Sequence, residues 1–140
     1  MLVARRRKTA APADTEPADT GPGSDLRVRE LCSTTVLISA AGEIDACNAE
    51  DVAVRIEAAI AGHRQLVLDL TAVRFCGTAG YAMLRRLDIH CRRKRVDWVL
   101  LPGSEVRRLL RICDPDGVIP TAENVVAGVA WLTRAEFHGA

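Results

Sequence analysis

The segment Phe75-Cys76-Gly77-Thr78-Ala79-Gly80 places a thiol and a hydroxyl where an apolar run gives way to a helical pattern. A hydroxyl at such a junction can cap the N–H groups of the first helical turn. A phosphoryl group on Thr78 would meet those same donors and the positive end of the helix dipole. It would also add about −1.5 to −2 charges to the surface. Side-chain chemistry alone leaves both possibilities open, a simple helix cap or a phosphate-controlled binding surface.

The same segment matches no enzymatic motif. Ala82 stands where a cysteine phosphatase loop starting at Cys76 needs arginine, and no lysine follows Gly80 as it does in a Walker A loop. A nucleophile elbow needs glycine where Cys76 stands. The three histidines pair with no nucleophile in a readable motif, and the five cysteines lack the C-x-x-C spacing of zinc sites. We expect no enzymatic activity, no metal and no cofactor, with a nucleophilic Cys76 as the enzymatic alternative.

Composition narrows the class of protein. The chain has 140 residues, 49% of them hydrophobic and 26% charged, which is typical of a single globular domain. Its 19 basic residues against 18 acidic ones and its 4% aromatic content argue against nucleic-acid binding by bulk charge or base stacking. No run approaches the ~20 apolar residues of a membrane span. The basic stretch Arg5–Lys8 is followed by no apolar signal region, so we expect a cytoplasmic protein.

The first part of the chain differs from the rest. Residues 1–24 hold three of the six prolines and few large apolar side chains. Such a segment cannot bury enough apolar surface to offset the entropy lost on ordering. We therefore predict a disordered N-terminal tail over 1–24 and one folded domain over 25–140.

Strand and helix patterns alternate through that domain. The expected strands cover residues 26–31, 34–40, 66–70, 96–101 and 118–120. The expected helices cover residues 46–61, a stretch from Tyr81 onward, 104–113, and a last stretch capped by Thr121 and ending near Thr133. This order predicts an α/β fold with a small mixed sheet of four to five strands and about four helices, mainly covering one face.

Two acidic residues are expected near the same edge of this sheet as Thr78. Asp45 is the last residue of an expected turn at Gly42–Asp45 and would cap the first helix. Asp69 lies near the end of the expected strand 66–70. Loops after parallel strands emerge on one side of a sheet, so both carboxylates could line the edge that carries Thr78. The alternative is a cap for Asp45 and a turn-facing acid for Asp69.

Three segments together resemble a known family. They are Gly42-Glu43-Ile44-Asp45, Leu66-Val67-Leu68-Asp69-Leu70, and the stretch from Phe75 to Leu84. Their order and spacing are similar to those of the STAS domain, and more narrowly to the anti-sigma factor antagonists of bacteria. The family pattern reads roughly Gly-Glu-Leu-Asp, then Val-Leu-Asp-Leu, then Phe-x-Asp-Ser-Ser/Thr-Gly-Leu-x-x-Leu. The resemblance covers about residues 26–132.

The resemblance implies a function without catalysis. In that family a STAS-like domain binds an anti-sigma factor with a kinase-type ATPase fold, often a serine/threonine kinase, and so releases a sigma factor in a stress response. Phosphorylation of the hydroxyl at the helix start abolishes binding. Carried over to this sequence, the phosphoacceptor is Thr78. The partner-binding residues are then Glu43, Asp45, Cys76, Gly77, Ala79, Gly80 and Tyr81.

This sequence departs from the family pattern within the loop. Gly77 replaces the aspartate before the acceptor, Ala79 replaces the second hydroxyl residue, and the acceptor itself is threonine. One alternative is a STAS scaffold or nucleotide-responsive module that is not phosphorylated and serves another assembly. Another is redox control through a disulfide between Cys76 and Cys113, as resemblance to some actinobacterial relatives implies. Such a bond requires Cα atoms within about 7 Å.

Overall fold

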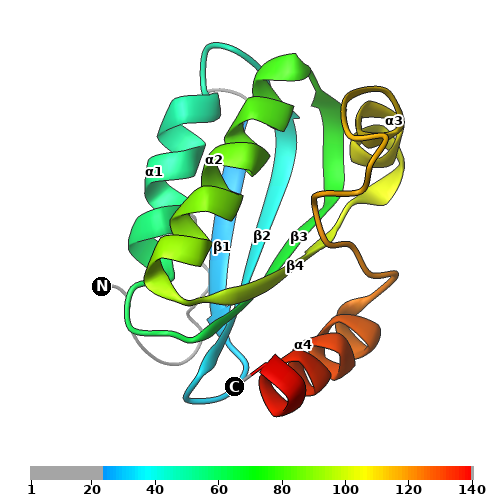
Figure 1. Cartoon of the computed structure of the whole chain (residues 1–140). Coiled ribbons are helices and arrows are strands. Elements are labelled where there is room, and N and C mark those ends of the chain that lie inside the picture. The colour runs from blue at the N-terminus through cyan, green and yellow to red at the C-terminus, as the bar shows by residue number, and fades with distance from the viewer. Residues whose placement is uncertain (1–23, 140) are drawn as a thin grey trace.

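A four-stranded mixed sheet forms the centre of the chain in the computed structural model, which describes residues 24–139. The strands are β1 (Ser24–Glu30), β2 (Thr35–Ile44), β3 (Gln65–Cys76) and β4 (Asp97–Leu101), in the order β1-β2-β3-β4. β1 pairs with β2 in antiparallel fashion, whereas β2, β3 and β4 are parallel. The carboxyl ends of β2 and β3 therefore lie together at one edge of the sheet (Figure 1).

Four helices within residues 24–139 cover the two faces of this sheet unequally. They are α1 (Ala49–Ala59), α2 (Thr78–Lys94), α3 (Gly103–Cys113) and α4 (Val125–Gly139). Helices α1 and α2 lie side by side across one face, and α3 packs beside them along β3 (Figure 1). Helix α4 contacts β3 and β4 from the opposite face.

The alternation of buried side chains in β3 explains this layering. Leu66, Leu68 and Leu70 point into the main core beneath α1, α2 and α3, whereas Val67 faces α4. All four side chains are fully buried, as expected for a parallel strand covered on both faces. On the α4 face Val67 packs with Val99, Leu101 and Leu132 in a small separate cluster.

The predicted class of fold is confirmed: the described part of the chain has four strands and four helices, three of the helices on one face. The fifth strand predicted over 118–120 does not form; a single parallel bridge joins Leu100 to Thr121 instead. The predicted cap at Thr121 is also wrong. Asn124 takes that role, since its Oδ1 accepts a hydrogen bond of 2.8 Å from the Ala127 N–H just after α4 begins.

Two boundaries near the candidate site also differ from the predictions. The turn expected at Gly42–Asp45 is strand through Ile44, because β3 continues to Cys76 and supplies backbone partners for it. Helix α2 begins at Thr78, three residues before the expected start at Tyr81. The predicted tail lies outside the described residues, except that Ser24 begins β1. Between residues 24 and 139, no helix combines the length and apolar character needed to cross a membrane.

Candidate functional site

The ends of β2 and β3 bring the two predicted parts of the site together. Ile44 and Cys76, the last residues of these strands, are register partners. The Gly77 N–H then donates a hydrogen bond of 3.0 Å to the Ile44 carbonyl. The segment around Glu43 and Asp45 therefore lies directly beside the junction that carries Thr78.

Thr78 is the first residue of α2, and its side chain is exposed. Gly77 occupies the N-cap position with an extended backbone and offers no side-chain cap. The Thr78 hydroxyl makes no hydrogen bond to any described residue. The interpretation of Thr78 as the helix cap is therefore wrong. This exposed residue opens the first turn of α2, which contains no acidic residue.

The loop after β2 is held by Asn48 rather than by Asp45. Asn48 is buried at the N-cap position of α1; its Oδ1 accepts from the Asp45 N–H at 3.0 Å and its Nδ2 donates to the Glu43 carbonyl at 2.8 Å. Asp45 accepts a hydrogen bond of 2.9 Å from the Cys47 N–H within the loop. The predicted cap at Asp45 is thus wrong. Sequence reasoning missed Asn48, which occupies the N-cap position without a side-chain cap hydrogen bond and instead bonds the backbone of the preceding loop.

Asp69 does not belong to this edge of the sheet. It lies in the middle of β3, where it pairs in register with Ser39 and Leu101. Cys76 is seven residues further along the strand, about 23 Å away at the usual rise per residue. The Asp69 carboxylate accepts hydrogen bonds from the backbone and hydroxyl of Thr71 at 2.9 and 2.6 Å. The prediction that Asp69 lines the edge with Thr78 is wrong because β3 is longer than its apolar run.

Cys76 supports the site from beneath. Its thiol is buried, and burial, with a smaller contribution from the neighbouring Cys113, raises the pKa of Cys76 to about 11. A Cβ built on Gly80 would collide with Cys76 Sγ, so the first turn of α2 rests directly on this sulfur. A protonated, buried thiol does not support the alternative of Cys76 as a nucleophile. The Cys113 thiol is half-buried, and both thiols are free.

Two aromatic residues frame the exposed side of the junction. The Tyr81 hydroxyl accepts a hydrogen bond of 3.2 Å from Arg85, and its ring packs partly against the core. Phe75 leaves 49% of its surface exposed, next to the backbone of Gly77. Sequence reasoning assigned Phe75 no contact role, although a large exposed apolar side chain beside a polar loop is typical of a binding surface.

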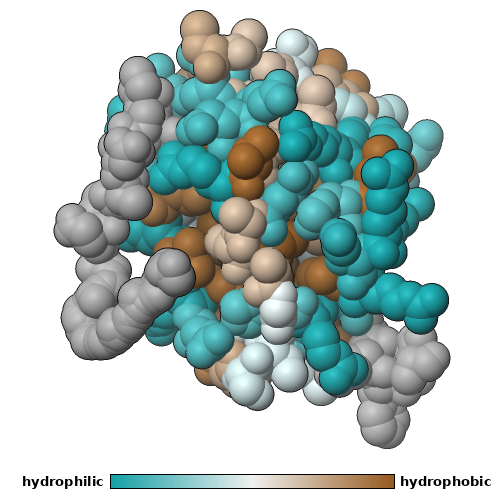
Figure 2. All heavy atoms as spheres, turned by 90° about the vertical axis from the view of Figure 1, so that its left-hand side faces the viewer, coloured by the Kyte–Doolittle hydropathy of each residue, from teal (hydrophilic) through white to brown (hydrophobic). Residues whose placement is uncertain are grey.

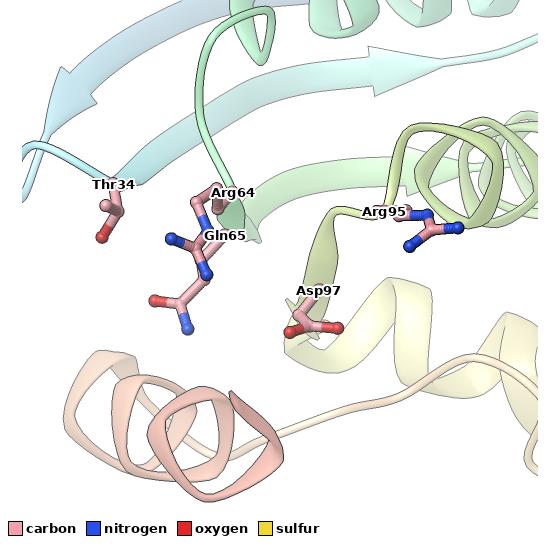
Figure 3. A pocket seen from close by; sticks show the side chains of 5 residues that line it. All are labelled: Thr34, Arg64, Gln65, Arg95 and Asp97. Carbon is pink, nitrogen blue, oxygen red and sulfur yellow. The ribbon is translucent and has the colours of Figure 1, made fainter. Parts of the chain in front are cut away.

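Two hollows in the described structure are not lined by Thr78. One of about 60 Å³ sits at the starts of β2, β3 and β4 (Figure 3), and it is lined by Thr34, Arg64, Gln65, Arg95 and Asp97. A cleft of about 390 Å³ lies near the ends of α1 and α2 and includes His63 and His90. Within residues 24–139, no group of three or more His, Cys, Asp or Glu side chains could hold a metal ion. The candidate site, centred on the exposed Thr78, thus lies outside both hollows.

The side of the molecule that carries α1 and β1 is mainly hydrophilic. Figure 2 shows that hydrophilic side chains dominate this side, with small hydrophobic areas between them. Exposed apolar residues on these two elements are Val28 and Val54, each close to half exposed. Ion pairs from α1 to α2, such as Glu57 with Arg86 at 2.8 Å, tie this side to the helix that begins at Thr78.

Comparison with known proteins identifies the family. Residues 25–128 match the STAS domain family, so the chain belongs to it. It is 33% identical over 91 residues to the anti-sigma-F factor antagonist RsfA of Mycobacterium tuberculosis, covering 62% of this chain and 71% of RsfA. It is 29% identical over 125 residues to osmosensory protein A of the same organism, covering 84% of this chain and 78% of that protein.

Solved structures support the fold. An anti-sigma factor antagonist from Mycobacterium paratuberculosis superposes with a TM-score of 0.68 at 23% identity, covering 81% of this chain and 98% of that one. The anti-sigma factor antagonist SpoIIAA in its unphosphorylated form gives a TM-score of 0.59 at 16% identity, covering 82% of this chain and 97% of its own. Together with the sequence matches, these structures confirm the resemblance inferred from the three motifs.

Proposed function

We propose that this chain is a non-enzymatic anti-sigma factor antagonist. It binds an anti-sigma factor with a kinase-type ATPase fold in the cytoplasm and so releases a sigma factor. Phosphorylation of Thr78 by that partner ends the interaction. The observation that carries the proposal is the exposed, unbonded Thr78 hydroxyl at the start of α2, beside the loop that holds Glu43 and Asp45.

The position of Thr78 suits a switch that changes binding without unfolding the chain. A phosphate there would lie near the free N–H groups and the positive end of α2, which favour negative charge. The fold should therefore tolerate the modification. Toward a docked partner, however, about two added charges would enter a desolvated interface, at a cost of several kcal/mol.

The chemistry of transfer requires only the Thr78 hydroxyl from this chain. Its Oγ1 forms the new bond to the γ-phosphorus of ATP held by the partner, ADP leaves, and the hydroxyl proton is released. Gly77 supplies no carboxylate to orient the hydroxyl, so the partner's own active site would position it. The loop is accessible for this approach because Thr78 and Glu43 are both exposed.

Incubation with purified kinase-type anti-sigma factors of the source organism and ATP tests the proposal. We expect a single phosphate on Thr78, located by mass spectrometry, and none on the Thr78→Val variant. We also expect Thr78→Glu to abolish a complex that Thr78→Val retains. A complex that forms equally well with Thr78→Glu would contradict the switch and favour an unphosphorylated STAS scaffold. The absence of a complex with every such partner would contradict the antagonist function itself.

The redox alternative concerns the same junction. Cys76 belongs to the main core, Cys113 packs against that core, and both thiols are free. A disulfide there would form by loss of two electrons and two protons to an added oxidant such as diamide. Non-reducing peptide mapping after that treatment should show a Cys76–Cys113 crosslink if this control exists. Binding that is unchanged after oxidation would exclude it.

A further inference from the structure

Helix α2 presents one continuous solvent-facing row that begins at the proposed phosphoacceptor. Its members, spaced by three or four residues, are Thr78, Ala82, Arg85, Ile89 and Arg93, and all five are exposed. Residues at these spacings share one face of a helix. From Thr78 to Arg93 the row extends about 22 Å at the usual helical rise. We call these five residues the α2 row; the helix lies across the front of the sheet in Figure 1.

The positive charges of the α2 row are not held in ion pairs within the described structure. Arg85 donates to the Tyr81 hydroxyl, and neither Arg85 nor Arg93 has a carboxylate within ion-pair distance. Neighbouring arginines off the row are paired: Arg86 binds Glu57 and Arg92 binds Asp88, each at 2.8 Å. The two cations of the row are therefore available to a partner, whereas those beside it are already neutralised.

An apolar side chain lies between these two cations. Ile89 is four residues from both Arg85 and Arg93 and leaves 45% of its surface exposed. An apolar centre with arginines around it is typical of protein–protein contact surfaces. The same row fits nucleic acid poorly, because it offers two cations and no aromatic ring, and the chain carries a net charge of only +1.

We propose that the α2 row extends the docking surface from Thr78 along α2 and binds an acidic patch with an apolar centre on the anti-sigma factor. The proposal rests on the proposed function and adds the chemistry of the partner. Carboxylates opposite Arg85 and Arg93 would steer association, and a pocket for Ile89 would slow dissociation.

The α2 row also extends the effect of the switch. A phosphate on Thr78 brings about −1.5 to −2 charges to the head of a row whose two arginines supply +2. Phosphorylation would therefore cancel most of the attraction toward an acidic partner, besides placing charge in the interface. On this basis the modified chain associates more slowly as well as dissociating faster.

Stopped-flow association with the anti-sigma factor that the full chain binds tests this inference. The variant Arg85→Gln/Arg93→Gln removes the two free cations of the row. The matched control, Arg107→Gln/Arg111→Gln, removes two exposed and unpaired arginines of α3. At low salt we expect the row variant to associate about tenfold more slowly and the control less than twofold more slowly, a difference that fades as salt screens the charges. Ile89→Ala should raise the dissociation rate several-fold and leave association unchanged.

The outcomes separate the two proposals. If the chain binds no anti-sigma factor, the proposed function fails and this inference with it. If the complex forms but the row variant and the α3 control associate at equal rates, only the inference is overturned. A third outcome also overturns the inference: the wild-type chain binds a 20-base-pair DNA duplex, and the row variant loses that binding but binds the anti-sigma factor as before. The α2 row would then be assigned to nucleic acid.

Discussion

Replacement of Gly80 by alanine should disturb the site through a single collision. The added methyl would overlap Cys76 Sγ and contact Ile44 Cγ2 at 3.5 Å. The sulfur is buried in the core at the end of β3, so we expect the first turn of α2 to move rather than the sulfur. Because Thr78 heads that turn, we expect Gly80→Ala to lower both the free energy of unfolding and the affinity for the partner.

The size of the effect follows from two opposing contributions. Overpacking a well-packed core by one methyl costs about 1–3 kcal/mol. Alanine is favoured over glycine inside a helix by about 1 kcal/mol. The expected net loss is therefore between about 0 and 2 kcal/mol. In a Cys76→Ala background the collision is absent, and the same substitution should stabilise the chain by up to about 1 kcal/mol.

Urea unfolding of the wild type, both single variants and the double variant measures this coupling. We expect an interaction energy between positions 76 and 80 of about 1–3 kcal/mol, and recovery of partner binding in the double variant. If Gly80→Ala destabilises the chain equally in both backgrounds, the close approach of Cys76 Sγ does not position the first turn of α2, and our account of this junction is refuted.

Three further changes test other parts of the structure. Gly77→Asp places a capping carboxylate at the start of α2 without backbone strain, since φ at Gly77 is −84°. We expect it to raise the free energy of unfolding in urea by about 0.5 kcal/mol. If Gly77→Asp is no more stable than Gly77→Ala, this prediction is contradicted. The buried Trp98 indole N–H donates a hydrogen bond of 3.0 Å to Asp88 Oδ1, and Asp88→Ala leaves it without an acceptor. We expect this variant to lower the free energy of unfolding, followed by fluorescence, by about 2–3 kcal/mol, and Asp88→Asn to lower it much less. Hydrogen bonds from neighbouring threonines lower the pKa of the exposed Cys32 thiol to about 7, so its alkylation rate should rise through a midpoint near pH 7. Cys76 should stay unreactive in the folded chain. Peptide mapping that finds Cys76 modified first would refute this prediction.

Features encoded within one segment were predictable from the sequence. The run of apolar residues in 66–70 indicated the buried strand, and the helical periodicity after Tyr81 indicated α2. The position of a hydroxyl between these two patterns was enough to single out Thr78. In each case a local pattern, either continuous apolarity or a repeat of 3.6 residues, determined the outcome.

Features that depend on partners distant in the chain were not predictable in the same way. The segment Gly42–Asp45 has the composition of a turn, yet β2 continues through it to Ile44 because β3 runs alongside as far as Cys76. The same extension moved Asp69 from a strand end to mid-strand. Asn48, and not Asp45, holds the loop before α1 because its side chain reaches the Glu43 carbonyl, and that is a matter of three-dimensional placement.

The small cluster on the far face of the sheet has a consequence for how the sequence can change. Helix α4 is seated on Val67, Val99 and Leu101, and none of these side chains belongs to the junction that carries Thr78. Mutations that repack this seat should alter folding but leave the exposed junction intact. Residues of the cluster under α4 can therefore change in related proteins at a different rate from residues of the junction that carries Thr78.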